Sequence, residues 1–243
     1  MAQLVVTKHG RVSVLTLTRP DAGNRITQIM AEELTAALTI ARHDKATSGC
    51  VLTGHGNVFC LGGDYLSAGP SAAARLQFGQ SHIDLVNAAA QLGKPLIAAV
   101  NGDAHAGGFS LVAACDMAFV AEEATLGLPE RAHGLFPFLA LAIARDTLPK
   151  KVLFEIIFNA RLLRADEACA LHLANAVVTR ATVLPRAIEA VERAADGNPD
   201  ILRLGRDLYY TMRGLSPSDA LDQSRLALVA ALEAREQQRE RDG

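Results

Sequence analysis

The chain has 243 residues, of which 50% are hydrophobic and 21% charged, and its formal net charge is −2. This length allows one large domain, or one domain with a small appendage. The near-neutral charge, without a basic run, argues against a nucleic-acid partner, and the absence of Trp argues against a stacking platform for bases.

The location of the protein is predicted from what its sequence lacks. The N-terminus has no basic segment followed by an apolar one, and Gly, Pro or charged residues interrupt every apolar run before ~18 residues. The four cysteines are widely spaced, without metal-ligand spacing. We therefore expect a cytoplasmic protein with reduced thiols, no membrane span and no metal site.

The N-terminal third predicts a hairpin followed by a helix. Two alternating apolar runs, at 3–8 and 11–20, flank a His-Gly turn. Residues 27–44 have helical spacing with Thr27 as N-cap. The apolar face expected for this helix consists of Ile29, Met30, Leu34, Ala37, Leu38 and Ala41.

The rest of the chain alternates strands and helices before becoming helical. The pattern predicts a strand at 49–54, a helix at 71–93, a strand at 95–102, a strand with its turn at 116–127, and helices almost throughout from 138, ending in 218–243. Strand–helix alternation followed by a helical tail indicates an α/β core with a C-terminal helical region.

Two glycine-rich loops follow predicted strands. In "GDAHAGGFSLVAACD", Gly107 and Gly108 stand where a strand gives way to an apolar helical segment. Glycine lets backbone N–H groups approach a ligand, and the first N–H groups of a helix favour an anion or a developing oxyanion. Close helix–strand packing explains the pair equally well. The loop "CLGGDY", with Gly62 and Gly63, makes an oxyanion hole built from both loops possible.

These segments carry a resemblance to a known family. "TLTRPDAGNRIT", "GNVFCLGGDYLSAG", "KPLIAAVNGDAHAGGFSLVAACDMAFVAEEATLGLPE" and "LLRADEACALHLANAVV" resemble, in order and separation, the crotonase superfamily, the enoyl-CoA hydratase/isomerase family. The resemblance implies an α/β fold: a repeated ββα spiral core, assigned to residues 1–190, and a C-terminal helical trimerisation region, assigned to 191–243. It also implies an acyl-CoA substrate and a homotrimer or dimer of trimers.

The resemblance assigns roles residue by residue. The backbone N–H groups of Leu61 and Gly107 match the family's oxyanion hole. Residues matching CoA- or acyl-binding positions are Ala22 and Asn24 near the nucleotide, Gly62, Gly63 and Asp64 along the pantetheine arm, and Tyr65 and Phe136 as walls for the acyl chain. An Asp after a glycine turn also often caps backbone N–H groups, which is a structural alternative for Asp64.

The predicted acid/base chemistry departs from that of the family's hydratases, which use two glutamates. Glu130, in "TLGLPE", matches the second, but Ser110 stands at the first position. A hydroxyl cannot act as a general base without help, although it can orient a water or a substrate group. One carboxylate beside an oxyanion hole favours double-bond isomerisation through an enolate, with the Glu130 pKa raised by apolar surroundings.

Several alternatives stay open. They are 2-enoyl-CoA hydration despite Ser110, acyl-CoA decarboxylation or thioester hydrolysis on the same scaffold, and a catalytically inactive acyl-CoA-binding or assembly protein. His105 and His133 are secondary candidates for catalysis, and "GFSLV" lacks the second glycine of a nucleophile elbow. The charged C-terminus lacks the family's CoA-contacting segment, which leaves an acyl-carrier protein possible as thioester donor. No cofactor beyond the CoA of the substrate is expected.

Overall fold

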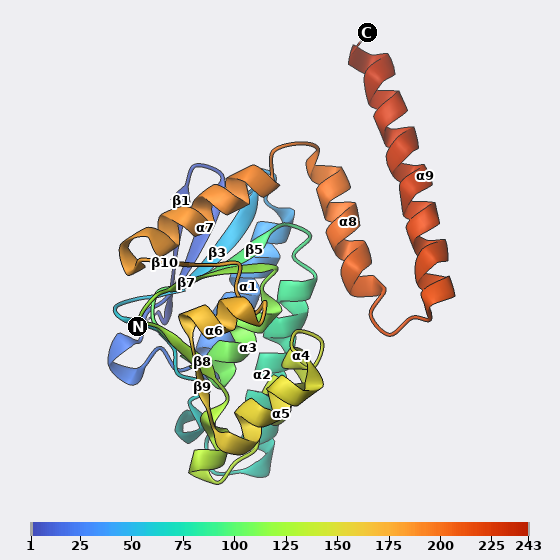
Figure 1. Cartoon of the computed structure of the whole chain (residues 1–243). Helices are drawn as coiled ribbons and strands as arrows, with labels where there is room; N and C mark the ends of the chain where they lie inside the picture. Colours follow the sequence, from blue (N-terminus) through green and yellow to red (C-terminus); the bar gives the residue numbers. More distant parts are fainter. Residues whose placement is uncertain (1, 243) are drawn as a thin grey trace.

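The computed structural model describes residues 2–242, in which two sheets are packed among helices (Figure 1). The larger sheet has the strand order β1-β2-β3-β5-β7-β10 and the smaller has the order β4-β6-β8-β9. The strands are β1 (Leu4–His9), β2 (Val12–Leu17), β3 (Gly49–Gly54), β4 (Val58–Cys60), β5 (Leu96–Val100), β6 (Asp103–His105), β7 (Met117–Ala121), β8 (Thr125–Gly127), β9 (Leu162–Arg164) and β10 (Ala176–Val178). The α-helices are α1 (Gln28–His43), α2 (Ala72–Ala90), α3 (Gly107–Ala114), α4 (Phe138–Ala144), α5 (Lys150–Asn159), α6 (Ala165–Ala170), α7 (Arg180–Ala194), α8 (Pro199–Thr211) and α9 (Pro217–Asp242), and the 3-10 helices are η1 (Pro20–Ala22), η2 (Tyr65–Ala68) and η3 (Pro129–His133).

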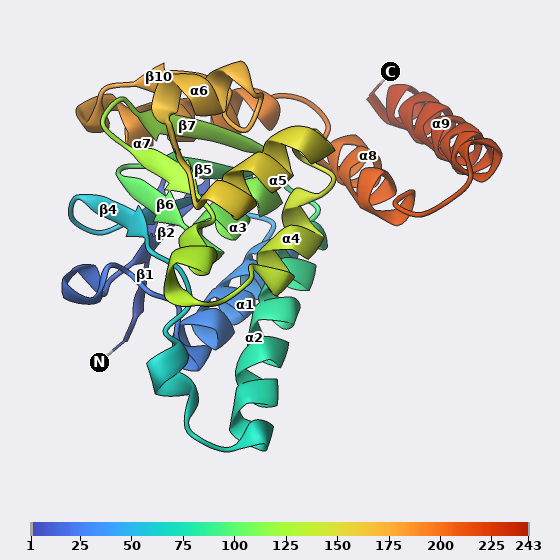
Figure 2. The same ribbon diagram turned by 60° about the horizontal axis from the view of Figure 1, so that its bottom comes forward.

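The strands follow the expected ββα spiral. β2, β3, β5, β7 and β10 run parallel, and parallel neighbours need a crossover connection. Here each crossover contains a strand of the smaller sheet before its helix, in the order β3-β4-α2, then β5-β6-α3, then β7-β8-α4. Figure 2 shows the two sheets with α1 and α2 below them and α6 and α7 above. The loops that follow β4, β6 and β8 thereby come to one region.

The N-terminal predictions are confirmed with one exception. β1 and β2 pair antiparallel from Leu4 opposite Leu17 to His9 opposite Val12. In α1, the Thr27 Oγ1 atom accepts the Met30 N–H at 3.1 Å, as expected of an N-cap. The buried face of α1 consists of Met30, Ala31, Leu34, Leu38 and Ala41. Ile29 was wrongly placed on this face: it is 54% exposed, because its side chain points about 100° away from that of Met30, on the side opposite to Leu34 and Leu38.

The prediction of helices almost throughout from residue 138 was wrong at two places. β9 pairs antiparallel with β8, and β10 pairs parallel with β7, so each completes the edge of a sheet. Each strand has three residues, which is too short for an alternating pattern to stand out from helical neighbours. The four cysteines are free, with Cys50 and Cys60 buried.

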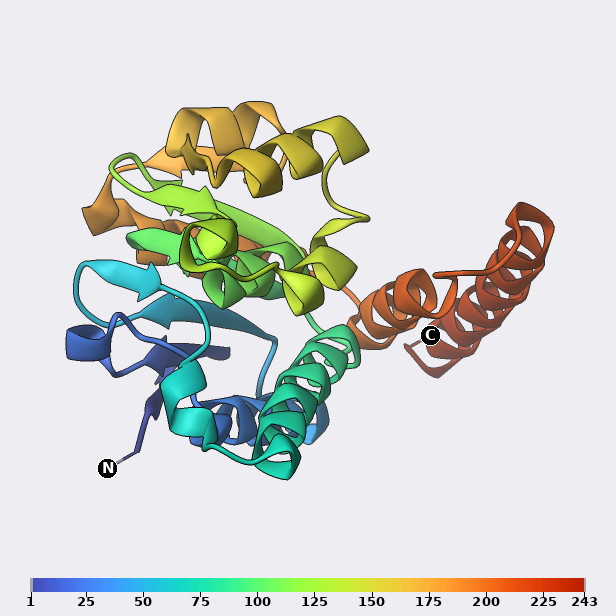
Figure 3. The ribbon, with the colours of Figure 1, turned by 90° about the horizontal axis from the view of Figure 1, so that it is seen from below.

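The C-terminal helices divide into one that covers the sheet and two that leave it. α7 packs Val183, Ala187 and Val191 against the larger sheet. α7 continues past residue 190 and ends at Ala194. The predicted division of the chain into a core of residues 1–190 and a helical region of residues 191–243 stays a prediction. α8 and α9 project from the body, as Figures 1 and 3 show. Among residues 2–242, no helix combines the length and apolar character needed to cross a membrane.

Candidate active site

Two backbone loops meet at the ends of neighbouring parallel strands. β4 leads into Gly62 and Gly63, and β6 leads into Ala106 and Gly107. A Cβ atom added to Gly62 would lie 2.8 Å from the Ala106 Cβ and 3.4 Å from the Gly107 amide nitrogen. A Cβ atom added to Gly107 would lie 3.3 Å from the Gly63 amide nitrogen. The absence of side chains at these glycines therefore lets the two loops touch and leaves both amides uncovered.

The two amides that face this space are those of Gly63 and Gly107. Neither amide nitrogen has a hydrogen-bond partner among residues 2–242. The expectation for Leu61 is corrected, because its N–H already donates to the Gly23 carbonyl oxygen at 2.9 Å. Gly62 and Asp64, by contrast, are tied to Ile26 through their backbone, which fixes the Gly63 peptide between them.

The orientation of the Gly107 amide is set by an unusual residue before it. Ala106 has φ 52° and ψ −117°, a conformation that side-chain-bearing residues rarely adopt and that often marks a functional site. The Ala106 carbonyl oxygen accepts from the Ser110 N–H at 3.1 Å and from the Ser110 Oγ at 3.2 Å. In a trans peptide, the N–H points opposite to the C=O. The Gly107 N–H consequently points away from α3, where it is free to meet a ligand.

The neighbouring glycine has a different role. A Cβ atom at Gly108 would lie only 2.0 Å from the Cys60 carbonyl oxygen. Gly108 therefore serves close packing of α3 on β4, whereas Gly107 exposes an amide. Of the two explanations considered for this glycine pair, exposure of a backbone amide applies to Gly107 and close helix–strand packing applies to Gly108.

Glu130 lies in η3, directly after Pro129. It is only 7% exposed, and its Oε2 atom is buried with no partner among residues 2–242. Burial raises the pKa of the Glu130 carboxyl, and a hydrogen bond from its own backbone N–H partly opposes this. A carboxylate that is desolvated and unpaired is a strong proton acceptor.

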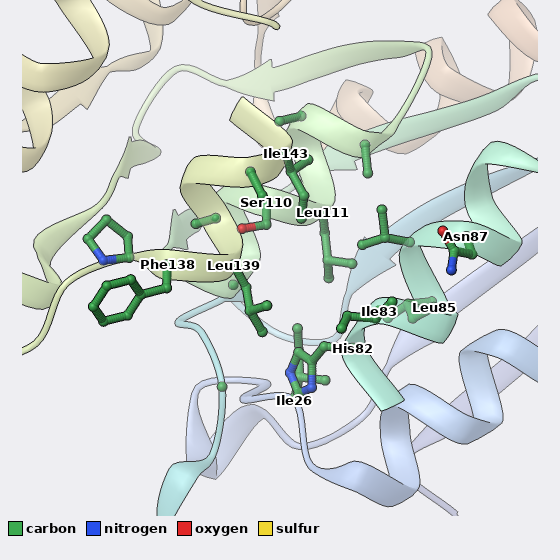
Figure 4. Close-up of a pocket in the computed structure, with 18 of the residues that line it drawn as sticks. Ile26, His82, Ile83, Leu85, Asn87, Ser110, Leu111, Phe138, Leu139 and Ile143 are labelled. Atoms are coloured by element: carbon green, nitrogen blue, oxygen red, sulfur yellow. The ribbon is translucent and has the colours of Figure 1, made fainter. Parts of the chain in front are cut away.

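Two cavities meet beside this carboxylate. The larger has a volume of about 280 Å³ and lies among α2, α3, α4 and α8, and the second has a volume of about 250 Å³. Gly63, Tyr65 and Glu130 line both cavities. Among the described residues that line either one, Glu130 is the only carboxylate. Figure 4 shows the apolar wall of the larger cavity, with Ser110 directed into it.

Several predicted residues lie where a ligand can reach them. Ser110 and Gly107 line the larger cavity. The Ser110 hydroxyl donates its hydrogen to the Ala106 carbonyl oxygen, so it has only lone pairs to offer. Burial and the charge of Glu130 raise the pKa of Tyr65, whose ring forms part of both cavity walls.

Asn24, Ala22 and Asp64 line neither cavity, and their contact with CoA stays a prediction. Asn24 is fully buried, and its side chain accepts from the Arg19 N–H at 2.8 Å and donates to the carbonyl oxygens of His55 and Val58 at 3.0 and 2.9 Å. Ala22 is half-buried in η1.

The side chain of Asp64 pairs with the Arg19 guanidinium at 2.9 Å and does not cap η2. The aromatic residue on the cavity wall also differs from the predicted one, Phe136. Phe136 packs against the core, while Phe138, whose ring centroid is 5.3 Å away, lines the larger cavity.

The two candidate histidines both line the smaller cavity. The His105 Nε2 atom lies 2.8 Å from the Thr125 Oγ1, and Thr125 donates to the Asp103 carboxylate at 2.7 Å. Burial lowers the pKa of His105, so this histidine is neutral and held in place. His133 is exposed. Within residues 2–242, no three His, Cys, Asp or Glu side chains come together as a metal site.

The sequence analysis missed His82, which lines the larger cavity from α2. A single histidine in an amphipathic helix carries no spacing signal, and only the fold, which places α2, α3 and α4 around one cavity, brings it there.

Comparison with known proteins agrees with this arrangement. The enoyl-CoA hydratase/isomerase family model matches residues 7–237. A Thermus thermophilus protein, provisionally named an enoyl-CoA hydratase, is 32% identical over 96% of this chain and 92% of its own. Carnitinyl-CoA dehydratase from Proteus mirabilis is 30% identical over 88% of this chain and 82% of its own. The solved enoyl-CoA hydratase from Mycobacterium smegmatis is 26% identical, with a TM-score of 0.90 over 95% of this chain and 91% of its own.

Proposed function

Because this chain belongs to the enoyl-CoA hydratase/isomerase family, we propose that it moves a double bond within an acyl-CoA thioester. The thioester carbonyl oxygen is held by the amides of Gly63 and Gly107, and Glu130 transfers the proton. The observation that carries this proposal is the single buried, unpartnered carboxylate of Glu130, placed where the two cavities meet.

The two amides stabilise the charge that develops on the thioester oxygen. Removing one donor of an oxyanion hole costs about 2.7–4 kcal/mol in enzymes where this was measured. Such donors need fixed orientations, which the backbone pairing of Gly62 and Asp64 with Ile26 and the turn at Ala106 supply here. The larger cavity, lined mainly by apolar side chains, suits the acyl chain, and the smaller one suits the pantetheine arm.

One carboxylate is sufficient for the isomerisation. In a 3-enoyl thioester, the Glu130 carboxylate takes a proton from C2, and the electron pair moves onto the thioester oxygen, giving a dienolate. The resulting carboxylic acid returns the proton to C4, and the electrons return to form the C2–C3 double bond. The raised pKa of Glu130 makes its carboxylate a stronger base, closer in basicity to the dienolate that its carboxylic acid form reprotonates.

Hydration is less well supported, because the two-carboxylate arrangement is incomplete. Ser110 donates its only hydroxyl hydrogen to the helix backbone and carries no basic group. Hydration, decarboxylation, thioester hydrolysis and acyl-CoA binding without turnover are the other outcomes that the experiment must separate. Decarboxylation and hydrolysis use the same two amides, and an acyl-carrier protein remains an alternative thioester donor.

The assembly is part of the same proposal. α9 extends away from the body and exposes large apolar side chains, namely Leu221, Leu226, Leu228, Val229 and Leu232. Apolar surface on a projecting helix is stabilised by contact with other copies of the chain. This supports the expected homotrimer or dimer of trimers, whose mass in solution tests it, and a cytoplasmic location stays a prediction.

The experiment is mass spectrometry of short 3-enoyl-, 2-enoyl- and saturated acyl-CoA thioesters incubated in D₂O. We expect wild type to convert the 3-enoyl to the 2-enoyl thioester with deuterium uptake, and Glu130→Gln to abolish both. Glu122→Gln is the matched control, because Glu122 is exposed in the turn after β7 and lines neither cavity. It should behave as wild type.

Each alternative reaction leaves its own mass change. Gain of one D₂O on the 2-enoyl thioester would show hydration, and free CoA would show hydrolysis. Loss of CO₂ from an added malonyl-type thioester would show decarboxylation. Binding without any mass change, together with no effect of Glu130→Gln, would refute an enzymatic role.

A further inference from the structure

His82 lines the cavity proposed to hold the acyl chain and carries a hydrogen-bond acceptor that is left unpaired. Its Nδ1 atom lies 2.9 Å from the Phe78 carbonyl oxygen, one turn earlier in α2. A carbonyl oxygen only accepts, so Nδ1 carries the hydrogen and Nε2 is left with a lone pair. Figure 4 shows His82 among the side chains that form the cavity wall.

This acceptor has no partner within the described part of the chain. The Nε2 atom is buried and makes no hydrogen bond to any residue of 2–242. Burial also lowers the pKa of His82, so the ring is neutral at physiological pH. A buried acceptor without a donor is costly, and such groups in native proteins normally have a partner.

The position of His82 relates it to the oxyanion amides. A Cβ atom at Gly63 would lie 3.3 Å from the Phe78 ring, so Phe78 packs directly behind that amide. The His82 ring packs against the Phe78 ring, with ring centroids 4.5 Å apart. Phe78 therefore contacts both Gly63 and His82, and His82 lines the same cavity as Gly63 and Gly107.

We propose that the acyl group taken by this protein carries a hydrogen-bond donor, a hydroxyl beyond C4, which His82 receives at Nε2. The inference rests on the proposed function, because it takes the larger cavity as the acyl site. The remaining wall is mainly apolar, with side chains such as Leu111, Leu139 and Ile143. A plain alkyl chain fills the same volume but leaves the acceptor desolvated and unpaired.

The test measures dissociation constants by calorimetry for saturated thioesters, which bind without a double bond to move. Hexanoyl-CoA is compared with 5- and 6-hydroxyhexanoyl-CoA, and each hydroxyl compound is compared with its methyl ether. We expect wild type to bind at least one alcohol about tenfold more tightly than hexanoyl-CoA. The matching ether should lose that advantage, because it keeps the oxygen but has no hydrogen to donate.

Two variants test whether the preference for the alcohol depends on the Nε2 acceptor or only on the presence of an aromatic ring at position 82. His82→Phe keeps an aromatic ring against Phe78 and removes Nε2, so the preference for the alcohol should disappear. His43→Phe is the matched control, since His43 is exposed at the end of α1 and lines neither cavity. It should keep the wild-type preference.

The outcomes distinguish this inference from the function on which it rests. Equal binding of hexanoyl-CoA and both alcohols, an ether as tight as its alcohol, or a preference that survives His82→Phe would each overturn the role of His82 alone. If deuterium exchange at C2 through Glu130 persists in that case, the proposed function stands. If no CoA thioester binds at all, both proposals fall together. The wild-type comparison of alcohol with ether decides the matter even if His82→Phe does not fold.

Discussion

Replacing Glu130 with glutamine is expected to stabilise the fold while it abolishes activity, and the gain should grow with pH. Glu130 is 7% exposed, and its Oε2 atom has no partner among residues 2–242. A buried polar group left unsatisfied costs about 1–3 kcal/mol, and more when it is charged. Glutamine has nearly the same shape and is neutral at every pH, so it removes the charged part of this cost.

The sign of the pH dependence follows from the direction of the pKa shift. The pKa of Glu130 in the folded state is raised above its ordinary value of 4.5. The stability that the neutral carboxyl allows is therefore fully present below the unfolded pKa and is lost as pH rises through the folded pKa. Wild type and Glu130→Gln should agree within about 0.5 kcal/mol near pH 4.5. At pH 8 the variant should be about 1–2 kcal/mol more stable.

Urea unfolding at both pH values, at one fixed protein concentration, measures this difference through the midpoint at unchanged slope. Glu122→Gln serves as control, because the exposed Glu122 carboxyl should change stability by less than about 0.5 kcal/mol at either pH. A gap between wild type and Glu130→Gln that is the same at both pH values would refute the reasoning. So would a variant that is less stable at pH 8.

The remaining predictions concern the loops and α3. Gly107→Ala places a Cβ atom 3.3 Å from the partner amide, so kcat/KM should fall about 10²–10³-fold with little change in urea midpoint. Gly108→Ala places its Cβ atom 2.0 Å from the Cys60 carbonyl oxygen, so urea unfolding should show a loss of about 1–3 kcal/mol. Asn24→Ala removes the side-chain acceptor of the Arg19 N–H and one side-chain donor from each of the His55 and Val58 carbonyl oxygens, and should lower the free energy of unfolding by about 1–3 kcal/mol. Ser110→Ala removes a hydroxyl that only supports the helix backbone, so isomerisation should slow by less than about tenfold in steady-state assays.

Local sequence patterns were sufficient to predict structure that depends only on residues close together in the chain. The hairpin at His9 and Gly10 and the N-cap at Thr27 are confirmed, because turn and cap chemistry act over two to four residues. The exposed Ile29 shows where this stops, since the width of a buried helix face depends on what packs against it. β9 and β10 were not recognised because their pairing partners lie far away in sequence.

The site itself divides in the same way. The sequence by itself indicated the two glycine-rich loops and showed a serine, Ser110, where a second carboxylate is expected. Its resemblance to the family predicted Leu61 and Gly107 as the oxyanion amides and Glu130 as the acid/base. Only the tertiary structure decided which amides are available. The Leu61 N–H is taken by the carbonyl of Gly23, 38 positions earlier in the chain, and the Gly63 N–H is left free.

The same reason applies to the burial of Glu130, to the position of Phe138 instead of Phe136 on the wall of the larger cavity, and to the position of His82 on that wall. A residue type states which hydrogen bonds and charges a side chain can offer. Whether those groups are already satisfied depends on partners that the fold brings from elsewhere in the chain.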